Sequence, residues 1–213
     1  MAQVRKWSNV AVAMQSALGA AKTLTAITQG ATATVTSTAH GFVNGDYVLL
    51  TVQGMRQVDG RLFRVASSTA NNFVLEGEDT SSYDAFSSGS AQLITFGTSI
   101  TTATSVSSSG GDFDFIDTTT IHGNIRTQIP GVASAATYTF ESHWDPADAA
   151  LAALKSASDN QAQRAIRLTF PNGFKLLGTG YIGCSLLPTG QAQDKVTTSV
   201  VMTLFGRPTL YTT

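Results

Sequence analysis

Charged residues are scarce in this chain. Asp, Glu, Lys and Arg make up only 13% of its 213 residues, against roughly a quarter of the residues in an ordinary soluble domain. The formal net charge is −1, so there is no overall basic field to hold nucleic acid. Depletion of charge is typical of the centres of protein interfaces, and here it indicates that neighbouring proteins cover much of the surface.

Cysteine and long apolar runs are also nearly absent. Cys184 is the one cysteine, which excludes an internal disulfide, and we interpret it as a small buried hydrophobe on a strand. No run of 18 apolar residues exists, so we expect no membrane span. Arg5 and Lys6 precede an apolar stretch as in a signal peptide, but Gln15 and Ser16 interrupt it, and we expect no cleavage.

The sequence lacks the patterns of an active site. His40, His122 and His143 do not have metal-ligand spacing, and no GxSxG elbow is present. His40 and His122 fall in predicted turns with structural roles, and His143 is expected to pack or cap beside a helix. We therefore predict that the chain has no catalytic, cofactor-binding or metal-binding residue and is not an enzyme.

Two further patterns are weighed against structural explanations. The stretch Gly178–Gly183 matches GxGxxG by letter, but a strand runs through the glycines and Pro188 prevents a helix after them, so we interpret them as sites of close backbone approach or a strand bend. Asp112 and Asp114 share one face of a strand, with Asp117 nearby. They predict either a calcium site or, as we favour, a solvated edge that resists unwanted pairing.

Hydroxyl side chains replace the missing charge. The chain holds 30 Thr, 21 Ser and 19 Gly, and 42% of its residues are hydrophobic. This composition favours many short strands and turns around a buried core. The length suits one large domain, or one domain with a small companion.

Residues 28–96 carry short apolar runs at roughly ten-residue spacing, separated by Gly, Asn and Asp turns. This spacing predicts a small all-β barrel or sandwich. Its expected strands are residues 33–36, 47–52, 61–65, 72–77 and 91–96.

The segments on either side of this unit are less regular. Residues 4–18 predict either a strand behind a mobile arm or a short Ala-rich helix, and residues 23–28 a strand. The Ser/Thr/Gly-rich residues 97–111 predict a flexible loop or a weak edge strand. A turn is expected at Pro130-Gly131, and residues 136–141 alternate as a strand.

The best-patterned stretch runs from Tyr138 to Phe205. Asp145 is expected to be the N-cap of a helix with Pro146 in its first turn, an apolar face and an end near Ser158–Asn160. A tight hairpin is expected at Pro171–Gly173. Both faces of the last strand, residues 196–205, are fairly apolar, so we expect both to be covered. The expected helix face comprises Ala147, Ala150, Leu151 and Leu154.

Several motifs in this stretch resemble the major tail tube proteins of long-tailed, non-contractile bacteriophages. The resemblance covers about 140 residues from both ends of the chain. It rests on Trp144–Asp148, Ala162–Ile166, Gly180–Gly183, Asp194–Val196 and Gly206–Pro208, together with Asp117–Thr119 upstream.

The resemblance implies a mainly β fold, a tail-tube β-sandwich or barrel flanked by one α-helix, formed by residues 1–27 and 97–213. It also implies hexameric rings that stack into a hollow tube, the conduit for genome delivery. Expected partners are other copies, the tape measure protein, tail terminator and tip proteins, and DNA in transient passage, with no membrane. The expected location is the virion tail, reached through the host cytoplasm during assembly.

Residues 28–96 resemble a separate small β domain found in phage structural proteins, inserted here into the tube fold. The resemblance rests on His40–Phe42, Gly45-Asp46, Gly54-Met55, Phe63–Val65 and Asn72-Phe73. We expect it to decorate the outside of the tube. Two other functions stay open: a module that binds a glycan or host receptor through residues 28–96, and a secretion-system tube of the same fold.

Overall fold

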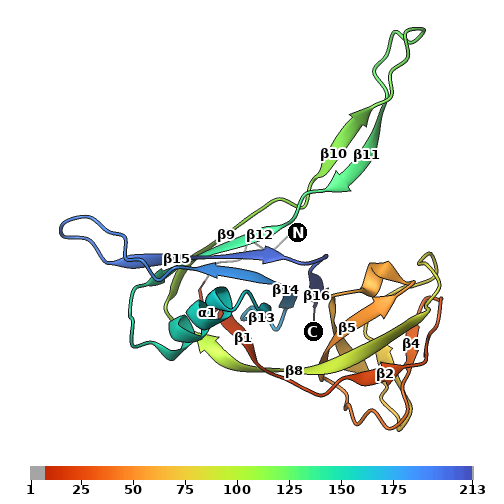
Figure 1. Ribbon diagram of the computed structural model, residues 1–213, viewed down its shortest axis with the longest axis horizontal. Helices are drawn as coiled ribbons and strands as arrows, with labels where there is room; N and C mark the ends of the chain where they lie inside the picture. Colours follow the sequence, from red (N-terminus) through yellow and green to blue (C-terminus); the bar gives the residue numbers. More distant parts are fainter. Residues whose placement is uncertain (1–7, 213) are drawn as a thin grey trace.

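Figure 1 shows the computed structural model of the protein, which describes residues 8–212. Strands dominate, and the described residues contain a single α-helix, α1 (Ala149–Asp159). The prediction of a mainly β fold flanked by one helix is therefore confirmed. No helix in the described part of the chain is long and apolar enough to cross a membrane.

One long strand, β8 (Ser88–Ile100), runs through both halves of the structure (Figure 1). Its first part pairs with β2 (Lys22–Leu24) and with β5 (Tyr47–Gln53). Its second part pairs with β1 (Ala11–Leu18). Each half of the fold thus takes part of its backbone hydrogen bonding from the same strand.

The first half is a small barrel of short antiparallel strands. Residues 22–27 close it, because β2 pairs with β8 while β3, directly after it, pairs with β4 at the far end of the sheet. Leu50, Phe63 and Phe73 lie fully buried at its centre. Strands form at all five expected places, but residues 22–27 also belong to the barrel and β8 continues past residue 96 into the second half. The remaining strands are β3 (Ala26–Ile27), β4 (Ala33–Thr36), β6 (Leu62–Ala66) and β7 (Asn72–Leu75).

In the second half, the sheet continues from β8 in the order β1-β13-β14-β15-β12-β9. Helix α1 buries Leu151 and Leu154 among side chains of these strands, such as Phe140 and Met202. The strands are β13 (Gln163–Thr169), β14 (Lys175–Cys184), β15 (Thr197–Leu204), β12 (Thr137–His143) and β9 (Ala103–Ser109), with β16 (Thr209–Tyr211) paired to β14.

The open alternatives for residues 4–18 and 97–111 are resolved towards strands. Within residues 4–18, the described part forms β1 rather than a helix, and the arm expected before it falls largely on residues 1–7, outside the described residues. Residues 97–111 supply the end of β8 and the edge strand β9 rather than a flexible loop. β16 was not predicted, because three residues near the chain end give too short a pattern.

The predicted helix N-cap is wrong by three residues. Asp148 is the N-cap, and its Oδ1 accepts a hydrogen bond of 2.8 Å from the Leu151 amide. Asp145 instead accepts from the Ala147 amide at 2.9 Å in the turn before the helix. Two Asp residues three positions apart give the same capping signal, and the tertiary fold selects the second. Consequently Ala147 lies outside the helix, and Ala157 takes its place on the buried face.

One predicted turn is confirmed and another is wrong. The Gly173 amide donates to the Phe170 carbonyl at 2.9 Å and the glycine has φ +88°, as a tight hairpin at Pro171–Gly173 requires. Pro130-Gly131 lies inside β11 (Gln128–Ala133), which pairs with β10 (Phe113–Asp117) across an irregular register. A bulge accommodates the proline there, because proline lacks the amide that a regular ladder uses.

Helix capping at Asp148 gives a direct test of this fold. We expect Asp148→Ala to lower the free energy of unfolding by about 1 kcal/mol, because the Leu151 amide loses its acceptor. Asp148→Asn keeps an acceptor and should retain most of that stability. Urea unfolding followed by circular dichroism measures both. Equal stability of Asp148→Ala and Asp148→Asn would contradict the assigned cap.

Candidate assembly surfaces

A two-stranded arm projects from the body of the molecule. Strands β10 and β11 form it, and it pairs with no other strand among the described residues (Figure 1). Its apolar side chains are exposed, with Ile121 at 97% and Val132 at 84% exposure. Exposed apolar groups in such number indicate a contact surface. The others are Phe113, Phe115, Ile116, Ile125 and Ile129.

The base of the arm depends on two glycines. Gly110 and Gly111 have φ +81° and +87°, a region that L side chains rarely adopt. A Cβ on Gly110 would lie 2.3 Å from the Ala135 carbonyl oxygen. The backbone can therefore leave β9 and enter the arm in a tight, defined direction.

The three predicted acidic residues lie at or on the arm. Asp112 and Asp114 are exposed and form no ion pair within the described residues, while the Asp117 carboxylate lies 3.7 Å from Arg126. Hydrogen bonds from the Thr119 side chain and amide lower the pKa of Asp117. Within residues 8–212 no three His, Cys, Asp or Glu side chains converge on a possible metal position.

Strand β9 leaves one edge of the sheet unpaired. It bonds to β12 on one side and to no described strand on the other. The Leu204 amide donates to the Ala136 carbonyl, and the direction of the backbone hydrogen bonds alternates from one residue to the next along β12. Even-numbered residues of β12 therefore bond to β15, and odd-numbered ones such as Thr139 bond to β9, where Thr139 is opposite Ser107. The amides of Val106 and Ser108 therefore point away from β12. The edge carries no charge or proline, the usual devices that prevent pairing with another chain.

The outer face of the same strands is open and nearly uncharged. In β15 burial alternates, so Val200 and Met202 are buried while Val201 is exposed. The prediction that both faces of this strand are covered is wrong for the single chain. Residues opposite one another share a face, and the open face carries Ser105, Ser107, Thr139, Glu141, Ser199, Val201, Thr203, Tyr181 and Gly183.

The glycine motif serves strand packing. β14 runs through Gly178, Gly180 and Gly183, and no helix follows it in the described part of the chain. A Cβ on Gly180 would lie 2.1 Å from the Thr203 carbonyl oxygen, and one on Gly178 would lie 2.8 Å from Leu204. The glycines allow close approach between strands, as the sequence predicted. Cys184 is buried on the same strand, and burial raises the pKa of its thiol.

The structure separates the three histidines. His40 is buried in the barrel, where its ring packs against those of Phe42 and Phe73, and its Nδ1 accepts from the Phe42 amide at 2.9 Å. His122 lies in the arm loop and His143 at the end of β12, both exposed. The expectation that His143 packs or caps beside the helix is wrong, because the side chain is exposed and Asp148 caps α1.

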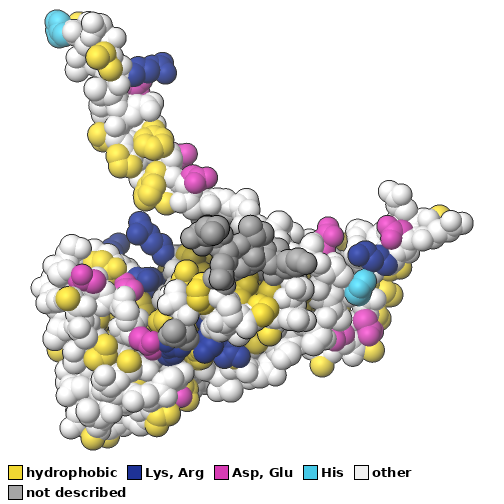
Figure 2. Space-filling model, turned by 180° about the vertical axis from the view of Figure 1, so that it is seen from behind, with side chains coloured by type: hydrophobic (Ala, Val, Ile, Leu, Met, Phe, Trp, Pro, Cys, Tyr) yellow, Lys and Arg dark blue, Asp and Glu magenta, His cyan; other side chains and the backbone are white. Residues whose placement is uncertain are grey.

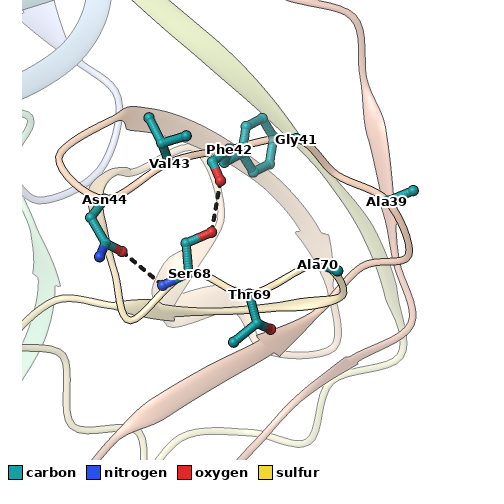
Figure 3. A pocket seen from close by; sticks show the side chains of 8 residues that line it. All are labelled: Ala39, Gly41, Phe42, Val43, Asn44, Ser68, Thr69 and Ala70. Carbon is teal, nitrogen blue, oxygen red and sulfur yellow. Dashed lines mark hydrogen bonds between the residues drawn. The ribbon is translucent and has the colours of Figure 1, made fainter.

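A shallow hollow lies between two loops of the barrel (Figure 3). The Ser68 hydroxyl donates to the Phe42 carbonyl at 2.7 Å, and the Ser68 amide donates to the Asn44 side chain at 2.7 Å. These bonds join the two loops to each other. The lining contains no charged side chain, and its one aromatic ring, Phe42, is buried. The hollow therefore offers few side chains that could recognise a ligand, and it gives little support to the receptor-binding alternative.

A comparison with known families identifies the kind of protein to which these surfaces belong. The family model described as "Phage tail tube protein, TTP" matches residues 53–213, most of the chain. The chain belongs to the phage tail tube protein family. Search of curated proteins gave no match. Tail tube proteins are structural rather than enzymatic, so this chain is a structural protein of the virion tail, and the family implies self-assembly with other tail proteins.

In this tail tube protein, the barrel is held firmly against the second half through residues that the sequence did not single out. The Tyr211 hydroxyl accepts from the Arg64 amide at 2.8 Å, and the Arg64 guanidinium lies 4.7 Å from the Tyr211 ring centre. The Thr179 hydroxyl donates to Gly60 at 2.6 Å. Arg167 stacks over Tyr47 and Phe96, at 5.6 Å and 4.8 Å. Only the fold brings these distant positions together.

Tyr211 makes this junction sensitive to high pH. Burial raises the pKa of Tyr211 to about 12. In the unfolded chain the pKa of a tyrosine is near 10, so the contribution of the protonated Tyr211 to the free energy of unfolding is complete below pH 10. That contribution is lost as the pH rises towards 12, at about 1.4 kcal/mol per pH unit. We expect Tyr211→Phe to remove this part of the alkaline loss and to cost about 1 kcal/mol at pH 8 through the lost hydrogen bond. Denaturant unfolding between pH 8 and 11.5 measures both, and an unchanged alkaline slope would contradict the role of Tyr211.

Proposed function

We propose that this tail tube protein assembles into hexameric rings that stack into the tail tube, the conduit for genome delivery. The observation that supports this most is the unpaired, uncharged edge of β9. An edge with free amides and carbonyls is a template for another strand, and a strand from the next subunit would continue the sheet around a ring.

The open face of β9, β12, β15 and β14 supports a lumen on that side. Small hydroxyl side chains dominate it, and Glu141 is its one charged group among the nine residues of the face. Cations hold the phosphates of DNA by releasing counterions. A face of hydroxyl groups with a carboxylate and no cation would let DNA pass without binding it.

The remaining parts of the proposal concern domains and partners. We keep the division that the sequence predicts, a tube domain of residues 1–27 with 97–213 and an inserted small domain of residues 28–96 on the outside, except that residues 22–27 are counted with the barrel that they close. The arm's exposed apolar side chains would be buried against neighbouring copies. The tape measure protein would occupy the lumen before DNA, the terminator and tip proteins would close the ends, and assembly would take place in the host cytoplasm.

Electron microscopy of the purified protein tests assembly directly. We expect six-fold rings or tubes at high concentration or with tail partners present. The edge itself is tested by Ser108→Pro, which removes an outward amide while the bonds to β12 remain. We expect this variant to stay monomeric or to assemble at least about tenfold more slowly, since every subunit contact loses a hydrogen bond.

Ser108→Ala is the matched control, because it removes the hydroxyl and keeps the amide. It should assemble like the wild type. A wild-type protein that remains monomeric under all these conditions would count against the proposed tube. Normal assembly of Ser108→Pro would show that β9 is not the edge used.

A further inference from the structure

A hollow lined by arginines lies where the barrel meets the C-terminal segment. Arg56, Arg61 and Arg207 line it, together with Gln57, Asp59, Tyr83 and Gly206. Arg61 is paired with Glu78 at 2.5 Å, and Asp59 accepts from the Val52 amide at 2.8 Å. The side chains of Arg56 and Arg207 are exposed and make no ion pair or hydrogen bond with the described residues. Figure 2 shows Lys and Arg side chains gathered in the notch between arm and barrel.

A second groove, with aromatic and small side chains in its lining, adjoins this hollow. It runs along the base of the arm and is lined by Phe113, Tyr138, Phe205 and Pro208 among others. Gly206 and Arg207 line both depressions, so Arg207 stands at their border. We call the two together the divided surface, because one half is lined by arginines and the other by aromatic rings. Phe205 is about half exposed there and is available for contact.

The arm has a matching division between its two faces. Phe113 and Phe115 alternate with Asp112 and Asp114, so the aromatic rings and the carboxylates point to opposite sides of the strand. Figure 2 shows the same separation, with hydrophobic side chains along one side of the arm and acidic ones along the other. Residues 112–133 hold three Asp and one Arg, and that Arg126 lies beside Asp117. The arm is therefore both apolar and acidic.

We propose that the divided surface receives the arm of a second copy of this chain. The arm enters the notch between the barrel and the base of the receiving arm (Figure 2), so that its carboxylate side, with Asp112 and Asp114, faces Arg56 and Arg207 while its aromatic side faces the groove beside Phe205. The chain's own arm is excluded as the occupant, because it projects away from the body and its Asp112 and Asp114 form no ion pair with the described residues (Figure 1). The inference rests on the proposed function, since it requires that copies assemble.

The contact is of the head-to-tail kind, in which one surface of a subunit meets a different surface of the next. Such contacts repeat without closing unless the rotation between subunits completes a ring, and this repetition suits stacked rings. Exposed ion pairs are individually weak. In this contact, apolar burial supplies most of the affinity, while the charges set the register and speed the encounter.

A charge exchange between the two surfaces tests this proposal. Arg207→Glu and Asp114→Arg each place like charges together, and we expect each to raise the protein concentration needed for assembly about tenfold. Combined in one chain, the two changes restore opposite charges, and we expect that concentration to return to within about threefold of the wild type. Sedimentation of assembled protein across a concentration series, with negative-stain microscopy, measures the effect.

The matched control combines Asp114→Arg with Lys195→Glu, an exposed lysine in the loop before β15. It has the same net charge as the exchange and should stay impaired. A second exchange, Arg56→Glu with Asp112→Arg, keeps the test valid if Arg207→Glu lowers the melting temperature. Recovery no better than the control in both exchanges would overturn the arm contact. A wild type that never assembles would overturn the proposed function instead.

Discussion

The backbone hydrogen bonding of β8 is the constraint on which both halves of this fold depend. Buried amides and carbonyls must be paired, and β8 supplies partners to β2 and β5 at one end and to β1 at the other. Tyr211, Thr179 and Arg167 then fix the two halves at their junction. The barrel is thus a built-in part of the sheet rather than a module on a flexible linker.

The need to pair backbone amides and carbonyls also connects the fold to function at β9, the strand that ends the sheet. The ladder that begins in the barrel stops at β9 with outward amides at Val106 and Ser108 and no charged side chain to discourage pairing. The arm adds exposed apolar side chains, which an isolated subunit cannot bury. This chain belongs to the phage tail tube protein family. Its unpaired β9 edge and exposed apolar arm support assembly into a tube in which neighbouring subunits cover them.

Local patterns in the sequence predicted much of the fold. The barrel strands, the hairpin at Gly173 and the strand passing through Gly178 and Gly180 all follow from short-range alternation and turn residues. The start of the helix was harder to predict, since Asp145 and Asp148 are equally suitable caps in the sequence. Only the folded structure shows that Asp148 accepts the hydrogen bond from the Leu151 amide.

The assembly surfaces were harder to predict because they depend on distant contacts. The outward edge of β9 becomes visible only once β12 is known to occupy its other side, and the arm only once β10 and β11 are known to pair with nothing else described. Arg56 and Arg207 are 151 positions apart, and their shared hollow exists because the barrel docks on the C-terminal segment. The sequence does give one indirect signal, the low charge of the chain.

Hydrogen–deuterium exchange of residues 103–109, compared between the monomer and the assembled protein, tests the central claim most directly. The claim is that the sheet continues from β9 into the next subunit. It predicts that the amides of Val106 and Ser108 exchange rapidly in the monomer and become protected at least about a hundredfold on assembly, as buried ladder amides are. Equally rapid exchange of these two amides in the assembled protein would contradict it.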